Sequence, residues 1–175
     1  MNIYIKFTST IILAIAFSSV VSAQEKPKRT ISPKDTIPIS LSEKRFMEKY
    51  ERNIKKTRIN GVYIPVDLQE AFSELTALSS KESLDKFKYA DVDFVVSRLH
   101  YGLGRWIIVN WNLYDGSRIG HHLKSYGVTH PDDQVRFLLH TYHNHLNSKE
   151  LNTNGVAEMI LSDRAKELER RKAKN

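Results

Sequence analysis

The chain contains no cysteine among its 175 residues. This absence excludes disulfide bonds, thiolate nucleophiles, thiolate zinc sites and cysteine-ligated iron–sulfur clusters. The sequence also lacks a nucleophile-elbow serine, a glycine-rich phosphate loop and a His-Glu-x-x-His pattern, so the common signatures of hydrolases, nucleotide-binding proteins and zinc proteases are missing. The fold must therefore be stabilised by packing alone, and any function must use a less common arrangement of side chains.

Long hydrophobic runs are absent except near the N-terminus. There, Lys6 precedes an apolar segment that begins at Ile11, and the small residues of Val21-Ser22-Ala23 suit a cleavage site. This pattern predicts a signal peptide over residues 1–23, with an uncleaved anchor as the alternative. We expect the mature chain to be exported to the periplasm or secreted, without a transmembrane segment.

Basic residues are not in excess in the centre of the chain, although the formal net charge is +7. Residues 61–147 carry a net charge of −2, so the excess lies in the flanking segments, where glutamate is interspersed. A nucleic-acid-binding module would gather basic residues on its folded surface. The distribution favours solvated helices instead. We expect a protein or a cell-envelope component as partner, and no nucleic acid.

Apolar residues recur at helical spacing along most of the chain, which predicts a mainly α-helical, small single-domain bundle. The first helix is expected to carry Phe46, Met47, Tyr50 and Ile54 at helical spacing, as on a helix with one face toward a core, and the second to include Leu78 in its apolar face. Capping residues place the helix starts at Ser40 or Ser42, Asp67, Ser79, Asp91, Ser117 and Pro131, with a last helix from about Val156.

The structure of the remaining segments is predicted from their composition. Residues 24–41 contain three prolines among polar residues and are predicted as a flexible linker. A helical domain is expected over residues 42–147, with a short extended lead-in around Pro65, and a charged C-terminal helix or tail over residues 148–175. No stretch alternates with period 2 for long enough to predict a sheet. The oligomeric state stays open.

Residues 99–147 contain all seven histidines and both tryptophans, together with Gly102 and Gly104 inside a helical pattern. Each glycine costs a helix about 1 kcal/mol relative to alanine. The two therefore indicate close backbone packing, a kink or room for a ligand, of which we favour packing. Further along, His122 lies on an apolar face and is expected to be a hydrogen-bonded core residue, whereas His121 is expected to point outward.

One helix carries His140 and His143 at i, i+3 spacing, so that both side chains could reach one zinc ion. The alternative is an exposed polar flank shared with Arg136 and Asn147. No zinc signature accompanies the pair. We therefore favour the exposed flank and expect no cofactor.

The segment His130-Pro131-Asp132-Asp133 also has two interpretations. Proline suits the first turn of a helix, and the carboxylates of Asp132 and Asp133 favour the positive end of its dipole. Alternatively, these two residues, with His130 and His100, are candidate acid–base catalysts. The carboxylates are adjacent in sequence and diverge along a helix, which favours capping.

Candidate binding residues lie between the two glycines and the next helix. Arg105 and Arg118 are candidates for binding an anion, with surface exposure as the alternative. Asn110 lies between Trp106 and Trp111 in sequence and is expected either to fix a turn or to line a pocket with them.

The central sequence resembles an uncharacterised bacterial family, a domain of unknown function, over about residues 62–147. The motifs that carry this resemblance are Tyr63-Ile64-Pro65, Leu99-His100-Tyr101-Gly102-Leu103-Gly104-Arg105-Trp106-Ile107, Asn110-Trp111-Asn112-Leu113-Tyr114, Gly116-Ser117-Arg118, His130-Pro131-Asp132-Asp133 and Tyr142-His143-Asn144-His145-Leu146-Asn147. The family pattern has tryptophan where this chain has Tyr114. The resemblance implies one domain with a secretion signal and assigns no catalytic residue.

Two functions remain open from the sequence. The first is an exported binding or accessory domain that recognises its partner through the regions His100–Arg118 and His130–His143. The second is a metal-dependent or acid–base hydrolase that uses the histidines and aspartate of the same regions: His100, His130, Asp132, His140 and His143. We favour binding, because no complete set of nucleophile, base and orienting group is present. Convergence of those five side chains in one pocket would favour the enzyme.

Overall fold

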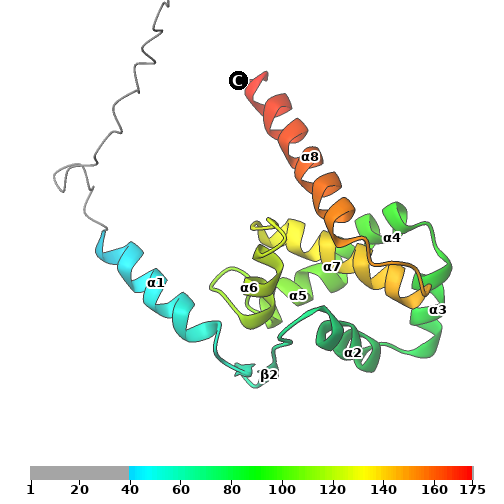
Figure 1. The fold of residues 1–175 in the computed structure, drawn as a ribbon, viewed down its shortest axis with the longest axis horizontal. Coiled ribbons are helices and arrows are strands. Elements are labelled where there is room, and N and C mark those ends of the chain that lie inside the picture. The colour runs from blue at the N-terminus through cyan, green and yellow to red at the C-terminus, as the bar shows by residue number, and fades with distance from the viewer. Residues whose placement is uncertain (1–39, 175) are drawn as a thin grey trace, which may run out of the picture. The chain divides into compact units, whose positions relative to one another are not determined.

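The computed structural model describes residues 40–174, and within that range the chain is mainly α-helical, as predicted. The predicted signal peptide and nearly all of the predicted linker lie outside the described residues. Figure 1 shows the order of the helices, which are α1 (Leu41–Asn53), α2 (Leu68–Leu78), α3 (Lys81–Tyr89), α4 (Val92–Leu99), the π-helical turn η2 (His100–Gly104), α5 (Arg105–Asn110), α6 (Arg118–Lys124), α7 (Pro131–Leu146) and α8 (Thr153–Lys172).

Side-chain caps begin most of these helices where the sequence predicts. A side-chain oxygen accepts a hydrogen bond from the backbone N–H three residues ahead at Ser40, Asp67, Asp91 and Ser117. The expected cap at Ser79 was wrong by one residue, because Ser80 Oγ accepts from Ser83 N at 3.2 Å and begins α3. Ser79 instead ends α2, its backbone N–H bonded to the carbonyl of Thr76.

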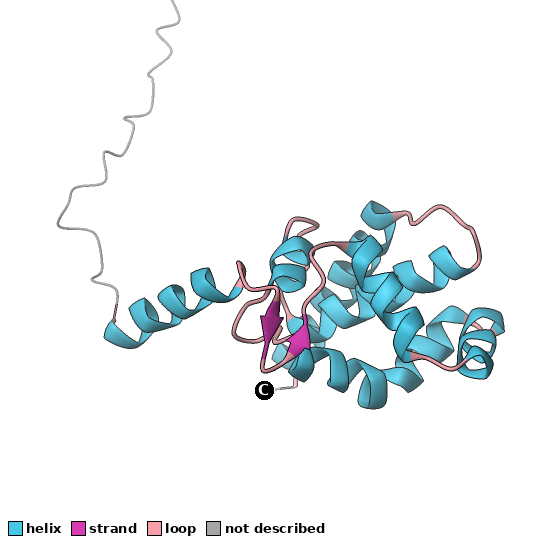
Figure 2. Ribbon diagram, turned by 90° about the horizontal axis from the view of Figure 1, so that it is seen from below, coloured by secondary structure: helices cyan, strands magenta, loops and turns pink. Residues whose placement is uncertain are grey.

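A small β-hairpin precedes α2, where the sequence predicts only an extended segment. Strands β1 (Arg58–Ile59) and β2 (Val62–Tyr63) pair antiparallel, and Figure 2 shows them as the two short arrows. Asn60 and Gly61 connect them with φ angles of 49° and 81°. Positive φ at both central residues is the geometry that favours Asn-Gly in two-residue hairpin turns. The extended lead-in is therefore one strand of this hairpin.

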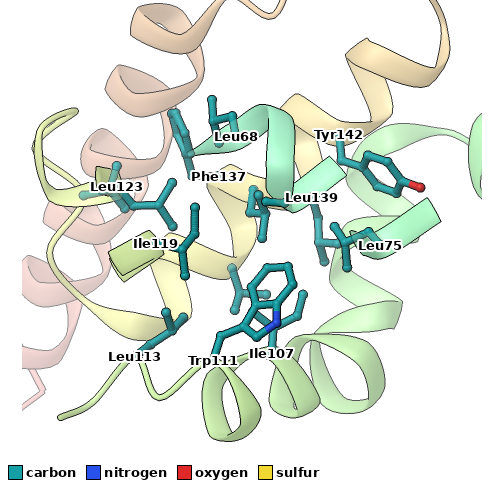
Figure 3. Packing of buried hydrophobic residues seen from close by; sticks show 14 of the residues in the cluster. Leu68, Leu75, Ile107, Trp111, Leu113, Ile119, Leu123, Phe137, Leu139 and Tyr142 are labelled. Carbon is teal, nitrogen blue, oxygen red and sulfur yellow. The ribbon is translucent and has the colours of Figure 1, made fainter. Parts of the chain in front are cut away.

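The core is built around α7. Its apolar face is buried at Val135, Leu138, Leu139 and Tyr142, each of which contributes roughly 1.5–3 kcal/mol as a buried side chain. Figure 3 shows Leu139 in the middle of the cluster, with Ile119 and Leu123 of α6 on one side and Leu75 of α2 beside Tyr142 on the other. Tyr142 also stacks on Phe72 of α2, with ring centroids 5.5 Å apart.

The π-helical turn η2 joins α4 to α5 and contains both glycines. Gly104 is buried against α7, and a Cβ atom at this position would lie 2.9 Å from Val135 Cγ1. Gly102 is exposed, and a Cβ atom there would meet nothing within 4 Å. Close packing therefore explains Gly104 and leaves Gly102 unexplained. Turns of the π type are frequent at functional sites.

The apolar stripe of α1 is largely exposed, contrary to expectation. Phe46 and Met47 are 46% and 50% exposed, and the only buried residue of the helix is Asn53. The stripe contacts the rest of the domain through Tyr50, which bonds His121 at 3.1 Å and packs against Gly116. The same correction applies to Leu78 of α2, which is exposed.

The charged helix α8 packs on α7 at its start, where Val156, Ala157 and Ile160 are buried. Asp163 and Arg164, midway along the helix, form ion pairs with α7, and the end of α8 carries charged residues and projects away from α7 (Figure 1). Most of the segment predicted as a charged C-terminal helix or tail is thus this helix. None of the helices in residues 40–174 combines the length and the apolar character that crossing a membrane requires.

Candidate functional site

A cleft of about 570 Å³ opens between α4 with η2, α7 and the part of α8 from Met159 to Arg164. Its volume lies within the usual range for small-molecule sites, and its lining combines apolar groups with converging polar ones. Four aspartates, two arginines and two histidines contribute, next to Val96, Tyr101 and Met159. The three walls come from segments well separated in sequence, so the site exists only in the folded domain.

One wall holds an imidazole beside a carboxylate. His140 on α7 is 7% exposed, and its Nε2 lies 3.7 Å from Oδ1 of Asp93 on α4, which is 78% exposed. Within residues 40–174, neither ring nitrogen of His140 makes a hydrogen bond. Burial lowers the pKa of His140, and the opposing attraction of Asp93 is the smaller effect. The cleft is thus lined by a neutral imidazole.

A second pair lies at the mouth of the cleft. The turn η2 carries His100, whose Nε2 is 3.7 Å from Oδ1 of Asp132 in the first turn of α7. His130 precedes that turn and caps it, since its Nδ1 accepts a hydrogen bond from the backbone N–H of Asp132 at 3.2 Å. His130 does not line the cleft. Of the candidate acid–base residues, His100 and Asp132 therefore converge and His130 serves the helix end.

Two ion pairs form the wall beside α8. Arg164 on α8 bonds the buried carboxylate of Asp133, and this bond raises the pKa of the arginine. Arg136 Nη2 on α7 lies 3.1 Å from Asp163 Oδ2 on α8. Asp133 was predicted to serve the end of its own helix. It lies in the first turn of α7 and also fastens α8 to α7.

The expected exposed flank of α7 is wrong at both histidines, because His140 and His143 are buried. They do not face one site either. His143 packs edge-on against Phe87 and its Nε2 lies 3.1 Å from the carbonyl oxygen of Ala90. Across the described part of the chain, no three histidine, aspartate or glutamate side chains are grouped to hold a metal ion.

The predicted binding residues lie outside the cleft. Trp111 is buried in the core and meets Trp106 edge-on, with centroids 6.3 Å apart, and Asn110 Nδ2 donates to the carbonyl of Trp106. Asn110 therefore stabilises the end of α5. Arg105 is exposed on the same helix.

Arg118 is engaged within the domain. Its Nε donates to the carbonyl of Ile64 at 3.1 Å, and its guanidinium lies 3.8 Å from the carboxylate of Glu70 and over the ring of Tyr63. Hydrogen bonds from Tyr63 and from the backbone of Val66 hold the pKa of Glu70 below its usual value. This arginine joins α6 to the hairpin and α2.

The two adjacent histidines of α6, His121 and His122, lie in different surroundings. His121 is exposed, as predicted, and bonds Tyr50. His122 is half-buried and meets Tyr126 edge-on at 5.5 Å, but within residues 40–174 its ring makes no hydrogen bond. The expectation of a hydrogen-bonded core histidine was therefore wrong, and an aromatic contact takes that place.

Several residues of the cleft are not among the candidates expected from the sequence, although some of them share a helical pattern. Asp93, Ser97 and His100 recur at i, i+4 and i+7, so they share one helical face that ends in a histidine. Asp163 and Arg164 carry no comparable signal, since they resemble the other charged residues of α8.

A comparison with known families finds one match. Residues 64–146 match the family described as Domain of unknown function (DUF6794), close to the boundaries that the motifs indicated. The searches of curated proteins and of solved structures found no match for this chain. The matched range contains α2 to α7, and α8, which supplies one wall of the cleft, lies beyond it. This central part of the chain is thus similar to a domain family of unknown function.

Proposed function

We propose that the protein is an exported binding domain that recognises a protein or cell-envelope partner through the cleft between α4, α7 and α8. One observation carries this proposal. Polar side chains from both regions singled out in the sequence, His100 from the first and Asp132 and His140 from the second, converge on one cleft of ligand size.

Binding is favoured over catalysis by the geometry of those groups. Ser97 lines the cleft, but no hydrogen bond joins it to His100 within the described residues. Both imidazole–carboxylate distances are 3.7 Å, which exceeds hydrogen-bond length. The groups are thus not assembled as nucleophile, base and orienting residue. They remain suited to contacting a ligand.

The test blocks the cleft without disturbing the core. Ser97 is exposed, so Ser97→Trp should fill the cleft and abolish capture of a partner from an envelope extract. Ser73→Trp is the matched control, because Ser73 is exposed on α2, away from the cleft. Circular dichroism should show both variants folded. Equal capture of the same partner by Ser97→Trp and by the wild-type chain would refute the proposal.

An acid–base hydrolase is the second candidate, and the two histidine–aspartate pairs in one cleft favour it. Such an enzyme should turn over a chromogenic ester, peptide or glycoside substrate. His100→Gln and His140→Gln should each abolish that turnover, whereas His130→Gln should leave most of it. Equal activity in all three variants would exclude this role for the cleft.

Export is proposed from the sequence of residues 1–23. Expression of the full chain in a bacterial host should yield a product in the periplasm or medium whose first residue is Gln24, as read by N-terminal sequencing. A product that stays in the cytoplasm and begins at Met1 would contradict this part of the proposal.

A further inference from the structure

We infer that the ligand of the cleft is recognised through a primary ammonium group, the chemistry shared by a lysine side chain and a free alkylamine. This inference rests on the proposed function, and it adds the class of ligand. It is argued from the charges that remain unpaired in the cleft, from the buried imidazole and from the apolar wall.

The charge of the cleft is negative once its internal ion pairs are set aside. The two arginines are occupied, Arg136 by Asp163 and Arg164 by Asp133. Asp93 and Asp132 have no lysine or arginine within ion-pair distance in the part of the chain that the structure describes, only imidazoles. These carboxylates have exposed side chains and are free to meet a cation.

The buried imidazole of His140 is the second, independent observation. A polar side chain that is more than nine-tenths buried normally has a hydrogen-bond partner. His140 has none among residues 40–174, and its ring nitrogens are not among the fully buried atoms without a partner, so they are open to the cleft that His140 lines. A neutral imidazole offers one acceptor nitrogen. The carboxylates of Asp93 and Asp132 line the same cleft, so acceptors of all three side chains are open to the donors of an ammonium group.

The apolar side chains of the cleft suit an alkyl chain behind that ammonium group. Val96 and Met159 line the cleft beside the polar groups, and Tyr101, which also lines it, is exposed. Lysine and alkylamines carry apolar stems that pack on such surfaces while the charged head meets acceptors. The face of Tyr101 adds a cation–π surface.

Other ligand classes fit less well. An anion would need a free cation, and both arginines are already paired. A metal ion would need three grouped ligands, and none are so grouped among the described residues.

Binding should weaken as the pH falls, because protonation of His140 removes its acceptor and adds a positive charge. The charged and titratable groups near this imidazole are Asp93 from α4, Arg136 and His143 from α7, and Asp163 from α8. Asp93 opposes the lowering of its pKa and Arg136 assists it. The loss of affinity should therefore lie below the ordinary histidine range, and His140→Gln should reduce it.

The experiment titrates the purified full chain with two cations and follows the histidine ring signals by NMR. The probes are n-butylamine and an N-acetylated, C-amidated lysyl peptide, which separate a free amine from a lysine side chain. Their controls are n-butanol, butyrate, an arginyl peptide and the norleucyl peptide. We expect saturable shifts of His140 and His100 with at least one ammonium probe and affinities about tenfold or more weaker for every control.

Substitutions of the cleft carboxylates test whether the ammonium probes bind in the cleft. Asp93→Asn and Asp132→Asn should each weaken ammonium binding about tenfold. Asp85→Asn is the matched control, since Asp85 is an exposed carboxylate on α3 that does not line the cleft. Shifts that do not saturate with either ammonium probe, or that are equal in all three variants, would overturn the inference.

The outcomes also separate this inference from the proposed function. If butyrate or the arginyl peptide saturates the cleft instead, and Ser97→Trp abolishes capture of the partner, the binding function stands and the ammonium ligand is wrong. If no probe shifts His140 and Ser97→Trp captures the partner as well as the wild-type chain does, both are wrong.

Discussion

Gly104 and Gly102 form a natural pair for testing how η2 packs on α7. Both lie in the same π-helical turn, and neither has a positive φ angle, so alanine is compatible with the backbone at each position. They differ in their surroundings, because Gly104 is buried against Val135 and Gly102 is exposed. We therefore expect Gly104→Ala and Gly102→Ala to change the free energy of unfolding in opposite directions.

The magnitudes follow from two competing effects. Alanine in place of glycine stabilises a helix by about 1 kcal/mol, and this gain is available at both positions. At Gly104 the new methyl group would lie 2.9 Å from Cγ1 of Val135, a fully buried and β-branched residue that has no free rotamer to adopt. Overpacking of this kind costs about 1–3 kcal/mol. Gly104→Ala should thus destabilise by about 1 kcal/mol, and Gly102→Ala should stabilise by up to about 1 kcal/mol.

Urea denaturation followed by far-UV circular dichroism measures both changes, and the double variant Gly104→Ala/Val135→Ala tests their cause. Removing the valine methyl groups makes room for the new one, so the double variant should be more stable than the sum of the single changes predicts. Equal stability of Gly104→Ala and Gly102→Ala would refute the argument. So would strict additivity in the double variant.

Three further predictions concern other contacts of the domain. Arg164→Met should destabilise by about 2 kcal/mol, less than a fully buried pair, because it leaves the buried carboxylate of Asp133 unpaired; Asp133→Asn should restore part of this loss in urea denaturation. Gly116→Ala should destabilise by about 2 kcal/mol or more, since Gly116 has a φ of 89° and a Cβ atom would overlap the ring of Tyr50; unchanged thermal stability would contradict it. Finally, the pKa of His140 is lower in the folded chain than its ordinary value of 6.5. The contribution of the neutral His140 to the free energy of unfolding should therefore be fully present above that pH and should be lost as the pH falls below it. His140→Gln should reduce this slope between about pH 7.5 and about pH 5, and an unchanged slope would contradict it.

Helix starts were predictable because caps are local. Asp67 and Asp91 each act on a backbone N–H three residues ahead, so the sequence contains both partners of the bond. The error at α3 has the same origin, because Ser79 and Ser80 are chemically identical and the choice between them depends on where α2 ends. The Asn60-Gly61 turn was also visible in the sequence, as a local hairpin signal.

Burial was predictable only where one helix determines it. The inward face of α7 follows from its periodicity, whereas the burial of His143 depends on Phe87 of α3 and the carbonyl of Ala90 before α4. On α1, the periodicity of Phe46 and Met47 is as regular as on α7, yet in the described domain little packs on it. A pattern states which face of a helix is apolar, and the neighbours decide whether that face is covered.

The chemistry of the cleft depends on α8 in a way that no local pattern contains. Without this helix, Asp133 would be a carboxylate without a guanidinium, and Arg136 would be a cation open to an anionic ligand. Asp163 and Arg164 pair with these two groups. Within the described residues, Asp93 then has only the imidazole of His140 at ion-pair distance. A segment beyond the matched family domain therefore decides the sign of the charge that the cleft presents, so relatives with a different charge pattern after α7 should select a different ligand.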